Sequence, residues 1–197
     1  MKIIKNKIVI ASHNEGKIIE IKEIFDDFKY QVYSSKDFNL QEPKENGSSF
    51  EENALIKAKF TAQKTNLVSL SDDSGLCIDA LNGQPGVYSA RIAGKEKDFN
   101  LAMNTLQKKM INKSNKTCKF VCALSLCWPN GCNITVKGEI SGHFVWPPRG
   151  NLGFGYDPIF QPNGMQETFA EIEPKIKHSI SHRYRAFQNL KMKINFL

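Results

Sequence analysis

Several features that mark special classes of protein are missing from these 197 residues. No apolar run approaches the ~20 residues that a helix needs to cross a bilayer, so we expect no membrane partner. Residues 1–7 are too short and too interrupted by lysine for a signal peptide, and we expect a cytoplasmic protein. There is no repeat, no low-complexity segment and no long run of like charges. What remains predicts one ordinary globular domain over residues 1–197.

Cysteine occurs, but in no metal-binding or disulfide pattern. The five cysteines are an odd number, none belongs to a CxxC pair, and no histidine lies at ligand spacing from them. Cys118 and Cys122 share the parity of an alternating segment and should point to one face of a sheet. We expect reduced, buried thiols; a zinc site or a disulfide framework is the alternative.

Basic residues exceed acidic ones and give a net charge of +7. Such a surplus favours a polyanionic partner, either nucleic acid or a phosphate-rich small molecule. The lysines are scattered along the chain, and a solvated surface accounts for most of them. Net charge alone does not choose between the two kinds of partner.

Hydrophobic periodicity predicts strands and helices in a mixed order. Strands are expected at 7–12, 30–35, 116–128 and 133–140, at the run ending at Leu70 and around Ile159; helices are expected at 17–28, 48–64, 97–112 and 179–193. Among the inward-facing residues we expect Phe28 in the first helix and Leu101 in the third. The elements do not alternate strictly, so the class is α/β with a mixed sheet.

The stretch "SLSDDSGL" (69–76) places two aspartates where an apolar run meets turn-forming residues. Adjacent like charges repel unless a cation lies beside them. One interpretation is a divalent metal site, since Mg²⁺ takes carboxylate oxygens and completes its shell with water and substrate phosphates. Glu45 is the candidate third acid beside Asp72 and Asp73. The alternative is an N-cap or Asx-turn pair that ends the strand.

Candidate anion-binding groups occur at two helix starts. The polar turn 12–17 leads from a strand into a helix, whose free backbone N–H groups favour anions, although its glycines are too few for a Walker or dinucleotide loop. The segment "KHSISHRYR" (177–185) gathers cations around the expected start of the last helix. Cations there oppose the helix dipole, which makes sense if an anion binds. The alternative for each cation is a solvated surface charge.

The segment "GFGYDPIF" (153–160) places Phe154 between two glycines. The backbone can therefore bend sharply and present the ring, which could stack on a nucleobase for ~1–3 kcal/mol. Asp157 could then pair with a base edge. The alternative is a core phenylalanine in a tight turn.

Acids for a metal, cations for phosphates and an aromatic ring for a base together indicate a nucleoside triphosphate. In six segments that occur in family order, the chain resembles the inosine/xanthosine triphosphate pyrophosphatases: 12–17, 45–59, 71–94, 148–160, 168–172 and 177–183. The resemblance implies two lobes around a long mixed β-sheet with flanking helices, an active-site cleft between the lobes, and usually a homodimer. It also implies Mg²⁺-dependent hydrolysis of deaminated purine nucleoside triphosphates to monophosphate and pyrophosphate.

The resemblance also implies roles for individual residues. Asp73 matches the general base that also contacts the metal, and Glu45 and Asp72 match its metal-site companions. Positions that match phosphate- and sugar-binding residues are Ser12, His13, Asn14, Glu15, Gly16, Lys17, Lys57 and Ser74. Positions that match the base-recognising group are Phe154, Gly155, Tyr156, Asp157, Lys177, His182 and Arg183. Ser12 stands where threonine is common, and both residues carry a hydroxyl group.

Two rival functions stay open at this stage. A hydrolase of modified pyrimidine triphosphates would need the same metal and phosphate groups. A nucleic-acid-binding module would use the basic surface and Phe154 to hold a flexible strand. The adjacent aspartates argue against the second, since acids repel a phosphate backbone, and we expect no stable nucleic-acid complex.

Overall fold

The computed structural model describes residues 6–25, 30–94 and 96–194. Its strands are hydrogen-bonded in the order β2-β1-β3-β4-β5-β6. They are β1 (Lys7–Ile10), β2 (Gln31–Ser34), β3 (Val68–Ile78), β4 (Thr117–Cys127), β5 (Asn133–Phe144) and β6 (Phe160–Pro162). β1 pairs in parallel with β2 and β3, whereas β5 and β6 are antiparallel. The expected mixed sheet of an α/β protein is therefore confirmed.

The helices are α1 (Glu15–Phe25), α2 (Phe50–Thr65), α3 (Ser89–Ile92), α4 (Phe99–Met110), α5 (Pro174–Ile180) and α6 (His182–Lys193), with short 3₁₀ turns that include η2 (Ser35–Phe38) and η5 (Asp157–Ile159). In the described part of the chain, no helix combines the length and the apolar character needed to span a membrane. The predicted inward position of Phe28 lies outside the described residues.

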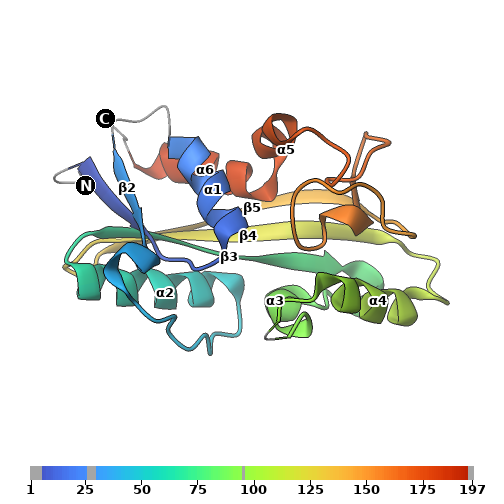
Figure 1. The fold of residues 1–197 in the computed structure, drawn as a ribbon, viewed down its shortest axis with the longest axis horizontal. Helices are drawn as coiled ribbons and strands as arrows, with labels where there is room; N and C mark the ends of the chain where they lie inside the picture. The colour runs from blue at the N-terminus through green and yellow to red at the C-terminus, as the bar shows by residue number, and fades with distance from the viewer. Residues whose placement is uncertain (1–5, 26–29, 95, 195–197) are drawn as a thin grey trace. The chain divides into compact units, whose positions relative to one another are not determined.

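The chain divides into two compact units. Unit 1 holds the residues up to Asp73, 122–138 and those from Arg183 onward. Within it, α2 covers one face of the strands, and α1 and α6 cover the other (Figure 1). Its core joins the α1 residues Ile18, Ile21 and Phe25 to β-strand residues and to Phe187 of α6. Phe25 and Phe187 meet edge to face, with ring centroids 5.4 Å apart.

Unit 2 holds residues 74–121 and 139–182. In its part of the sheet, α3 and α4 lie on one face and α5 on the other (Figure 1). Its core is rich in aromatic side chains, and Phe120 packs against both Phe160 and Phe169. The expected inward position of Leu101 on α4 is wrong: Leu101 is 59% exposed, and Met103, two residues further on, is buried instead.

The cysteine prediction is confirmed for three of the five residues, whereas Cys77 and Cys132 are only half-buried. All five cysteines are free thiols, and Cys118, Cys122 and Cys127 are buried. Within the described residues, no group of three or more histidine, cysteine or acidic side chains has the arrangement of a metal site. The zinc-site and disulfide alternatives therefore find no support.

Two local expectations about the chain's course are wrong. β3 does not end before the aspartate pair; it runs on through Asp72 and Asp73 to Ile78. The last helix does not begin at residue 179 as one element, because Ser181 adopts an extended conformation (φ −64°, ψ 160°) between α5 and α6. Both differences change the surroundings of the candidate site residues.

Candidate functional site

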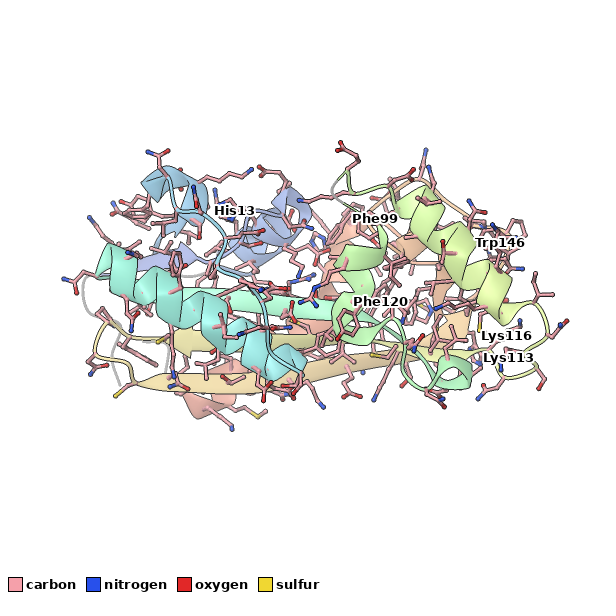
Figure 2. All side chains as sticks on the ribbon, turned by 90° about the horizontal axis from the view of Figure 1, so that it is seen from below. His13, Phe99, Lys113, Lys116, Phe120 and Trp146 are labelled. Atoms are coloured by element: carbon pink, nitrogen blue, oxygen red, sulfur yellow. The ribbon has the colours of Figure 1, made fainter. Side chains whose placement is uncertain are left out.

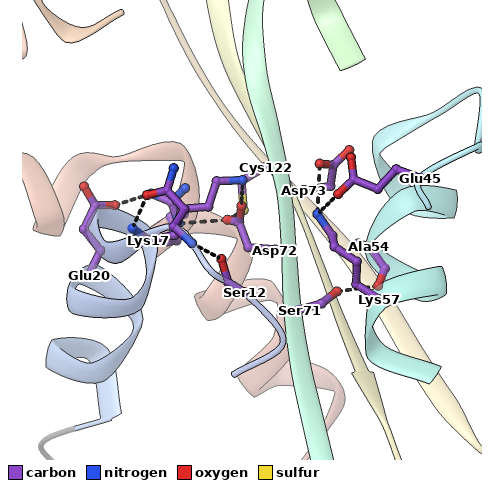
Figure 3. Close-up of polar contacts among 12 residues, drawn as sticks. Ser12, Lys17, Glu20, Glu45, Ala54, Lys57, Ser71, Asp72, Asp73 and Cys122 are labelled. Carbon is purple, nitrogen blue, oxygen red and sulfur yellow. Dashed lines mark hydrogen bonds and ion pairs between the residues drawn. The ribbon is translucent and has the colours of Figure 1, made fainter. Parts of the chain in front are cut away.

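The two adjacent aspartates point to opposite faces of β3. Successive side chains of a strand alternate between the two faces of a sheet. Asp72 accordingly faces α1, and Asp73 faces α2 (Figure 3). Lys17 and Arg183 pair with Asp72 and Lys57 pairs with Asp73, so the repulsion expected between neighbouring acids is relieved on both sides. Asp72 and Asp73 therefore contact different side chains.

Asp72 is the centre of a buried ionic cluster on the α1 side. Its Oδ1 lies 2.5 Å from Lys17 Nζ, and its Oδ2 accepts from Arg183 Nε at 2.8 Å and from the Cys122 thiol at 2.9 Å. Arg183 Nη1 also donates to the carboxylate of Glu20. These contacts join α1, β3, β4 and α6 within unit 1 (Figure 3).

Charge decides the protonation state of this cluster. Burial alone would raise the pKa of Asp72, but the nearby Arg183 and Lys17 outweigh it and hold that pKa well below its usual range. The two carboxylates raise the pKa of Arg183 in turn, against the effect of its own burial. Burial raises the pKa of the Cys122 thiol, which therefore stays a protonated donor.

Asp73, Glu45 and Lys57 form a second cluster on the α2 side of β3. Lys57 Nζ lies 2.6 Å from Glu45 Oε1 and 3.2 Å from Asp73 Oδ1, so one ammonium bridges two carboxylates (Figure 3). The Lys57 and Asp73 side chains are each only 9% exposed. Asp73 Oδ2 is buried and has no hydrogen-bond partner among the described residues. A buried carboxylate oxygen without a partner is costly unless a ligand satisfies it.

The pKa of Asp73 is shifted in the opposite direction to that of Asp72. Burial raises the pKa of Asp73 above its usual value, and Lys57 offsets that effect only in part. The neighbouring carboxylates raise the pKa of Lys57 even though burial acts to lower it, so the ammonium stays charged. Asp73 is thus the more basic of the two adjacent carboxylates.

The donor set of the second cluster fits a hard divalent cation. Two carboxylates, one of them with an unpartnered oxygen, are the kind of site in which Mg²⁺ is held together with substrate phosphates and water. Both oxygens of Asp72 are already engaged with Lys17, Arg183 and Cys122. The metal role of Asp72 stays a prediction, and its contacts favour an ion-pairing role.

The start of α2 positions this cluster. Ser49 is the N-cap of α2, and its hydroxyl accepts from the Glu52 backbone N–H, as the capping pattern predicts. The buried Asn53 amide oxygen accepts from Gly47 N at 2.9 Å and so fixes the loop that carries Glu45. A Cβ at Gly47 would lie 2.7 Å from that amide oxygen, so the loop needs glycine there.

The turn 12–17 connects β1 to α1 as predicted. Asn14 Oδ1 accepts from Lys17 N at 3.2 Å and caps the helix start, while the buried Ser12 hydroxyl accepts from Asn14 N at 3.1 Å. His13 contacts the Leu40 carbonyl oxygen at 2.7 Å, and Glu15 pairs with Lys36. His13 and Glu15 therefore hold neighbouring loops; their predicted phosphate contacts, and that of Gly16 in the first turn of α1, stay predictions.

The glycine-flanked aromatic ring of unit 2 lies against a buried ion pair. Lys177 Nζ is 2.6 Å from Asp157 Oδ2, which also accepts from Phe154 N at 2.8 Å. The same ammonium lies 4.7 Å from the centre of the half-buried Phe154 ring, within cation–π range. Gly153 and Gly155 have φ of +72° and +69°, so the sharp bend predicted around Phe154 is confirmed.

Other residues predicted to recognise the base have structural contacts in unit 2. Tyr156 is buried, and its hydroxyl donates to the Ser89 carbonyl oxygen at 2.8 Å. The His182 imidazole stacks on Phe120 with ring centroids 4.9 Å apart and 14° between their planes. Ser74, which was predicted to bind phosphate or sugar rather than the base, is half-buried on β3. The substrate contacts predicted for Tyr156, His182 and Ser74 stay predictions.

The sequence predicts that the cations of 177–185 gather around one helix start, and this prediction is wrong. Lys177 and His178 lie in the last turn of α5, where the helix dipole favours positive charge. Arg183 does lie at the start of α6, and the anions it faces are the Asp72 and Glu20 carboxylates. The argument that a ligand must neutralise this cluster therefore fails for Arg183, whose predicted base contact remains untested.

Four contributors to these clusters escaped sequence reasoning: Glu20, Asn53, Phe120 and Cys122. Glu20 lies three residues after Lys17 and so shares its helical face, a signal that could have found it. Asn53 follows the cap of α2, where a polar residue looks unremarkable. Phe120 shares the parity of Cys122 in the alternating segment 116–128, and both are buried, but no pattern predicts which polar group each one contacts.

The Ham1 family model matches residues 8–193. The chain belongs to the Ham1 family. A dITP/XTP pyrophosphatase from Zymomonas mobilis is 49% identical over 187 residues, which cover 93% of this chain and 90% of the relative. The Ham1 protein of Staphylococcus aureus is 39% identical with a TM-score of 0.85, over 95% of this chain and 97% of that one. A Ham1 protein from Coxiella burnetii is 37% identical with a TM-score of 0.87, over 95% of this chain and 97% of that one.

Membership of the Ham1 family confirms the resemblance that six short segments predicted. The matched span of 8–193 includes all six segments, and with them the Asp73 and Asp72 clusters of unit 1 and the Phe154 loop of unit 2. The solved Ham1 structures cover nearly the whole chain, which confirms the α/β fold.

Proposed function

We propose that this protein hydrolyses deaminated purine nucleoside triphosphates, such as those of inosine and xanthosine, to the monophosphate and pyrophosphate. The proposal has support from the relative named dITP/XTP pyrophosphatase, which matches over 93% of the chain. One observation in the protein itself carries it furthest. Asp73 is buried beside Glu45 and Lys57, has a raised pKa and keeps one oxygen without a hydrogen-bond partner.

In this proposal Asp73 acts as the general base. It accepts a proton from a water molecule as the water oxygen bonds to the α-phosphorus, and pyrophosphate leaves with the electrons of the broken P–O bond. The raised pKa of Asp73 improves it as a base relative to an ordinary aspartate. Lys57 stays charged between the two acids and stabilises the negative charge that accumulates on the phosphate oxygens.

Glu45 and Asp73 would hold Mg²⁺, which when bound neutralises part of the triphosphate charge and polarises the P–O bonds. Lys17 would extend the cationic surroundings of the phosphates, held in place by Asp72 at 2.5 Å. Most of the acceleration then comes from positioning and electrostatics rather than from a covalent step with the protein.

Base selectivity would come from the Phe154 loop. Its ring offers a stacking face, and Lys177 lies 4.7 Å from the ring centre with Asp157 as a fixed partner. An ammonium donates hydrogen bonds but cannot accept them, so it suits the 6-oxygen of hypoxanthine or xanthine and disfavours the 6-amino group of adenine. A buried donor left unpaired can reject the wrong base by ~10⁴ or more.

A panel of triphosphates tests the substrate class. With Mg²⁺, we expect pyrophosphate release from inosine and xanthosine triphosphates at a kcat/KM at least ~10²-fold above that for adenosine triphosphate, because of the unpaired donor. Chelation should abolish the turnover. Modified pyrimidine triphosphates and single-stranded oligonucleotides complete the panel.

Three results of this panel would contradict the proposal in different ways. Faster turnover of a modified pyrimidine triphosphate would favour the alternative hydrolase. Tight, salt-sensitive binding of oligonucleotides without turnover would favour a nucleic-acid-binding module. Release of orthophosphate would move the cleavage site to the terminal phosphate.

Truncation of the stacking ring is expected to weaken substrate binding. Phe154→Ala should raise KM for inosine triphosphate by about tenfold, because base stacking is worth ~1–3 kcal/mol, and should change kcat by less than about threefold. Phe38→Ala, at a half-exposed ring on η2 of unit 1, is the matched control. Steady-state kinetics measure both variants, and an unchanged KM in Phe154→Ala would remove the stacking role.

We also infer a homodimer in the cytoplasm. The dimer rests on the family resemblance, and the cytoplasmic location rests on the nucleotide pool in which the proposed substrates arise. Sedimentation of the purified protein at the mass of a single chain would disprove the homodimer. Recovery of the protein outside the cytoplasmic fraction of broken cells would disprove the cytoplasmic location.

A further inference from the structure

Unit 2 contains a pocket made by residues that have no part in the proposed reaction. Its volume is about 640 Å³, within the ~300–1,000 Å³ of small-molecule sites. It is formed where α4 and the chain leading into β4 meet the end of β5 and the segment that follows. Gln107, Lys116, Phe144, Trp146 and Arg149 contribute most of its chemistry.

The charge of the pocket has one sign. Among the described residues that line it, Lys116 and Arg149 are cationic and none is acidic. Lys116 Nζ donates to the Met110 carbonyl oxygen at 3.0 Å, which fixes the ammonium and leaves further N–H donors. Arg149 donates to the Gln166 carbonyl oxygen at 2.8 Å and lies 3.4 Å from Glu171, so its guanidinium is also held in place. Two fixed cations suit an anionic group such as a phosphate.

The pocket also offers an aromatic surface and a polar group. Trp146 is 38% exposed, one of the few large apolar side chains that unit 2 leaves accessible. Figure 2 places Trp146 at the same end of unit 2 as Lys116. The Gln107 side-chain oxygen is buried and has no hydrogen-bond partner among the described residues. An indole face stacks on planar rings, and an amide pairs with the N–H groups of a base.

We propose that this pocket is a second ligand site, which binds a planar aromatic anion of mononucleotide size. The ring stacks on Trp146, an N–H group attached to the ring, such as an exocyclic amino group, donates to Gln107, and the phosphate accepts from Lys116 and Arg149. The net charge of +7 raises the local concentration of such anions. The site is independent of the proposed reaction, since none of these four residues belongs to the clusters of Asp72, Asp73 or Phe154.

Tryptophan fluorescence tests the proposal with adenosine monophosphate as the probe. The chain has two tryptophans, and Trp128 is only 7% exposed, so a ligand in this pocket acts on Trp146. Adenine lacks the 6-oxygen that the proposed reaction site requires, which separates this binding from that site. We expect saturable quenching with a Kd below about 1 mM, and its loss in Trp146→Phe.

Lys116 and Lys113 provide a matched pair of variants. Both lie after α4 at the same end of unit 2 (Figure 2), but Lys113 is exposed and does not line the pocket. Lys116→Gln should weaken the binding of adenosine monophosphate about five- to tenfold, because one charge-assisted contact is lost. Lys113→Gln removes the same charge and should leave Kd within about twofold. Lys116→Arg should retain binding, and it keeps the test valid if Lys116→Gln folds poorly.

Several outcomes would overturn the second site. Quenching that does not saturate, or that persists in Trp146→Phe, would remove the role of Trp146. Equal weakening in Lys113→Gln and Lys116→Gln would reduce the effect to overall charge. Absence of binding combined with a lower molar mass of Lys116→Gln in sedimentation would show that this face contacts a second copy of the chain. Turnover of inosine triphosphate by Lys116→Gln should stay within about twofold of the wild-type rate. Whether the wild-type protein hydrolyses inosine triphosphate tests only the proposed reaction, not the second site.

Discussion

Asp73→Asn is expected to lower kcat for inosine triphosphate by about 10²–10⁴-fold, the usual loss when a general base is removed. The amide has nearly the same shape, but it cannot take a proton from water. Lys57 keeps Glu45 at 2.6 Å as its partner, so KM should change by less than about tenfold. Steady-state pyrophosphate release measures both constants.

The fold should survive this substitution. Asp73 is buried with one oxygen unpartnered and a raised pKa, so its charge is poorly solvated and an amide costs little. We expect the free energy of unfolding of Asp73→Asn to stay within about 1 kcal/mol of the wild type. Near-normal turnover in a folded Asp73→Asn protein would remove Asp73 from the proposed mechanism. If Asp73→Asn loses turnover because it unfolds, Glu45→Gln becomes the test of the proposed site. Glu45→Gln should lower kcat and weaken Mg²⁺ binding, which calorimetry measures.

The regular elements were predictable because their signals are local. The spacing of Ile18, Ile21 and Phe25 places an apolar stripe on α1, and all three residues are buried. The alternation from Cys118 to Trp128 predicts one buried face of β4, and that face is buried; from Phe120 to Cys127 the opposite face is buried as well, which the pattern does not predict. The capping pattern at Ser49 likewise predicts the start of α2. In each case a few neighbouring residues determine the outcome.

The course of β3 through its aspartates could not be predicted in the same way. An Asp-Asp-Ser-Gly sequence favours a turn when it is considered alone. Here the strand continues because distant cations neutralise both acids: Arg183, which contacts Asp72, lies 111 positions further along the chain. Tertiary contacts of such long range outweigh local turn preference, and a single sequence does not display them.

The candidate site was therefore predicted in its residue types and not in its grouping. Sequence reasoning placed Glu45, Asp72 and Asp73 at one metal. Strand alternation instead sends Asp72 to Lys17 and Arg183, and Asp73 to Lys57 and Glu45. The alternation rule was available from the sequence, but it applies only once these residues are known to lie within a strand. The expected strand end before Asp72 thus concealed that the two carboxylates have different partners, and their shared metal role stays a prediction.

Asp72→Asn is expected to destabilise the fold by about 3–5 kcal/mol, the usual cost of removing one partner from a buried ion pair. Arg183 and Lys17 would share the buried cluster with Glu20 as the remaining carboxylate. Chemical denaturation measures the loss. Asp73→Asn is the matched control, because it makes the same chemical change one residue further along β3 on the opposite face.

The dependence on pH gives this prediction a second readout. Arg183 and Lys17 hold the folded-state pKa of Asp72 well below its ordinary value of 3.8. A depressed pKa contributes stability that is fully present above the unfolded-state value and is lost as pH falls through the folded-state value. The gap in unfolding free energy between wild type and Asp72→Asn should therefore be constant near neutral pH and shrink below about pH 3.8. Equal destabilisation by Asp72→Asn and Asp73→Asn, or a gap that widens in acid, would show that the ionic cluster around Asp72 does not stabilise unit 1.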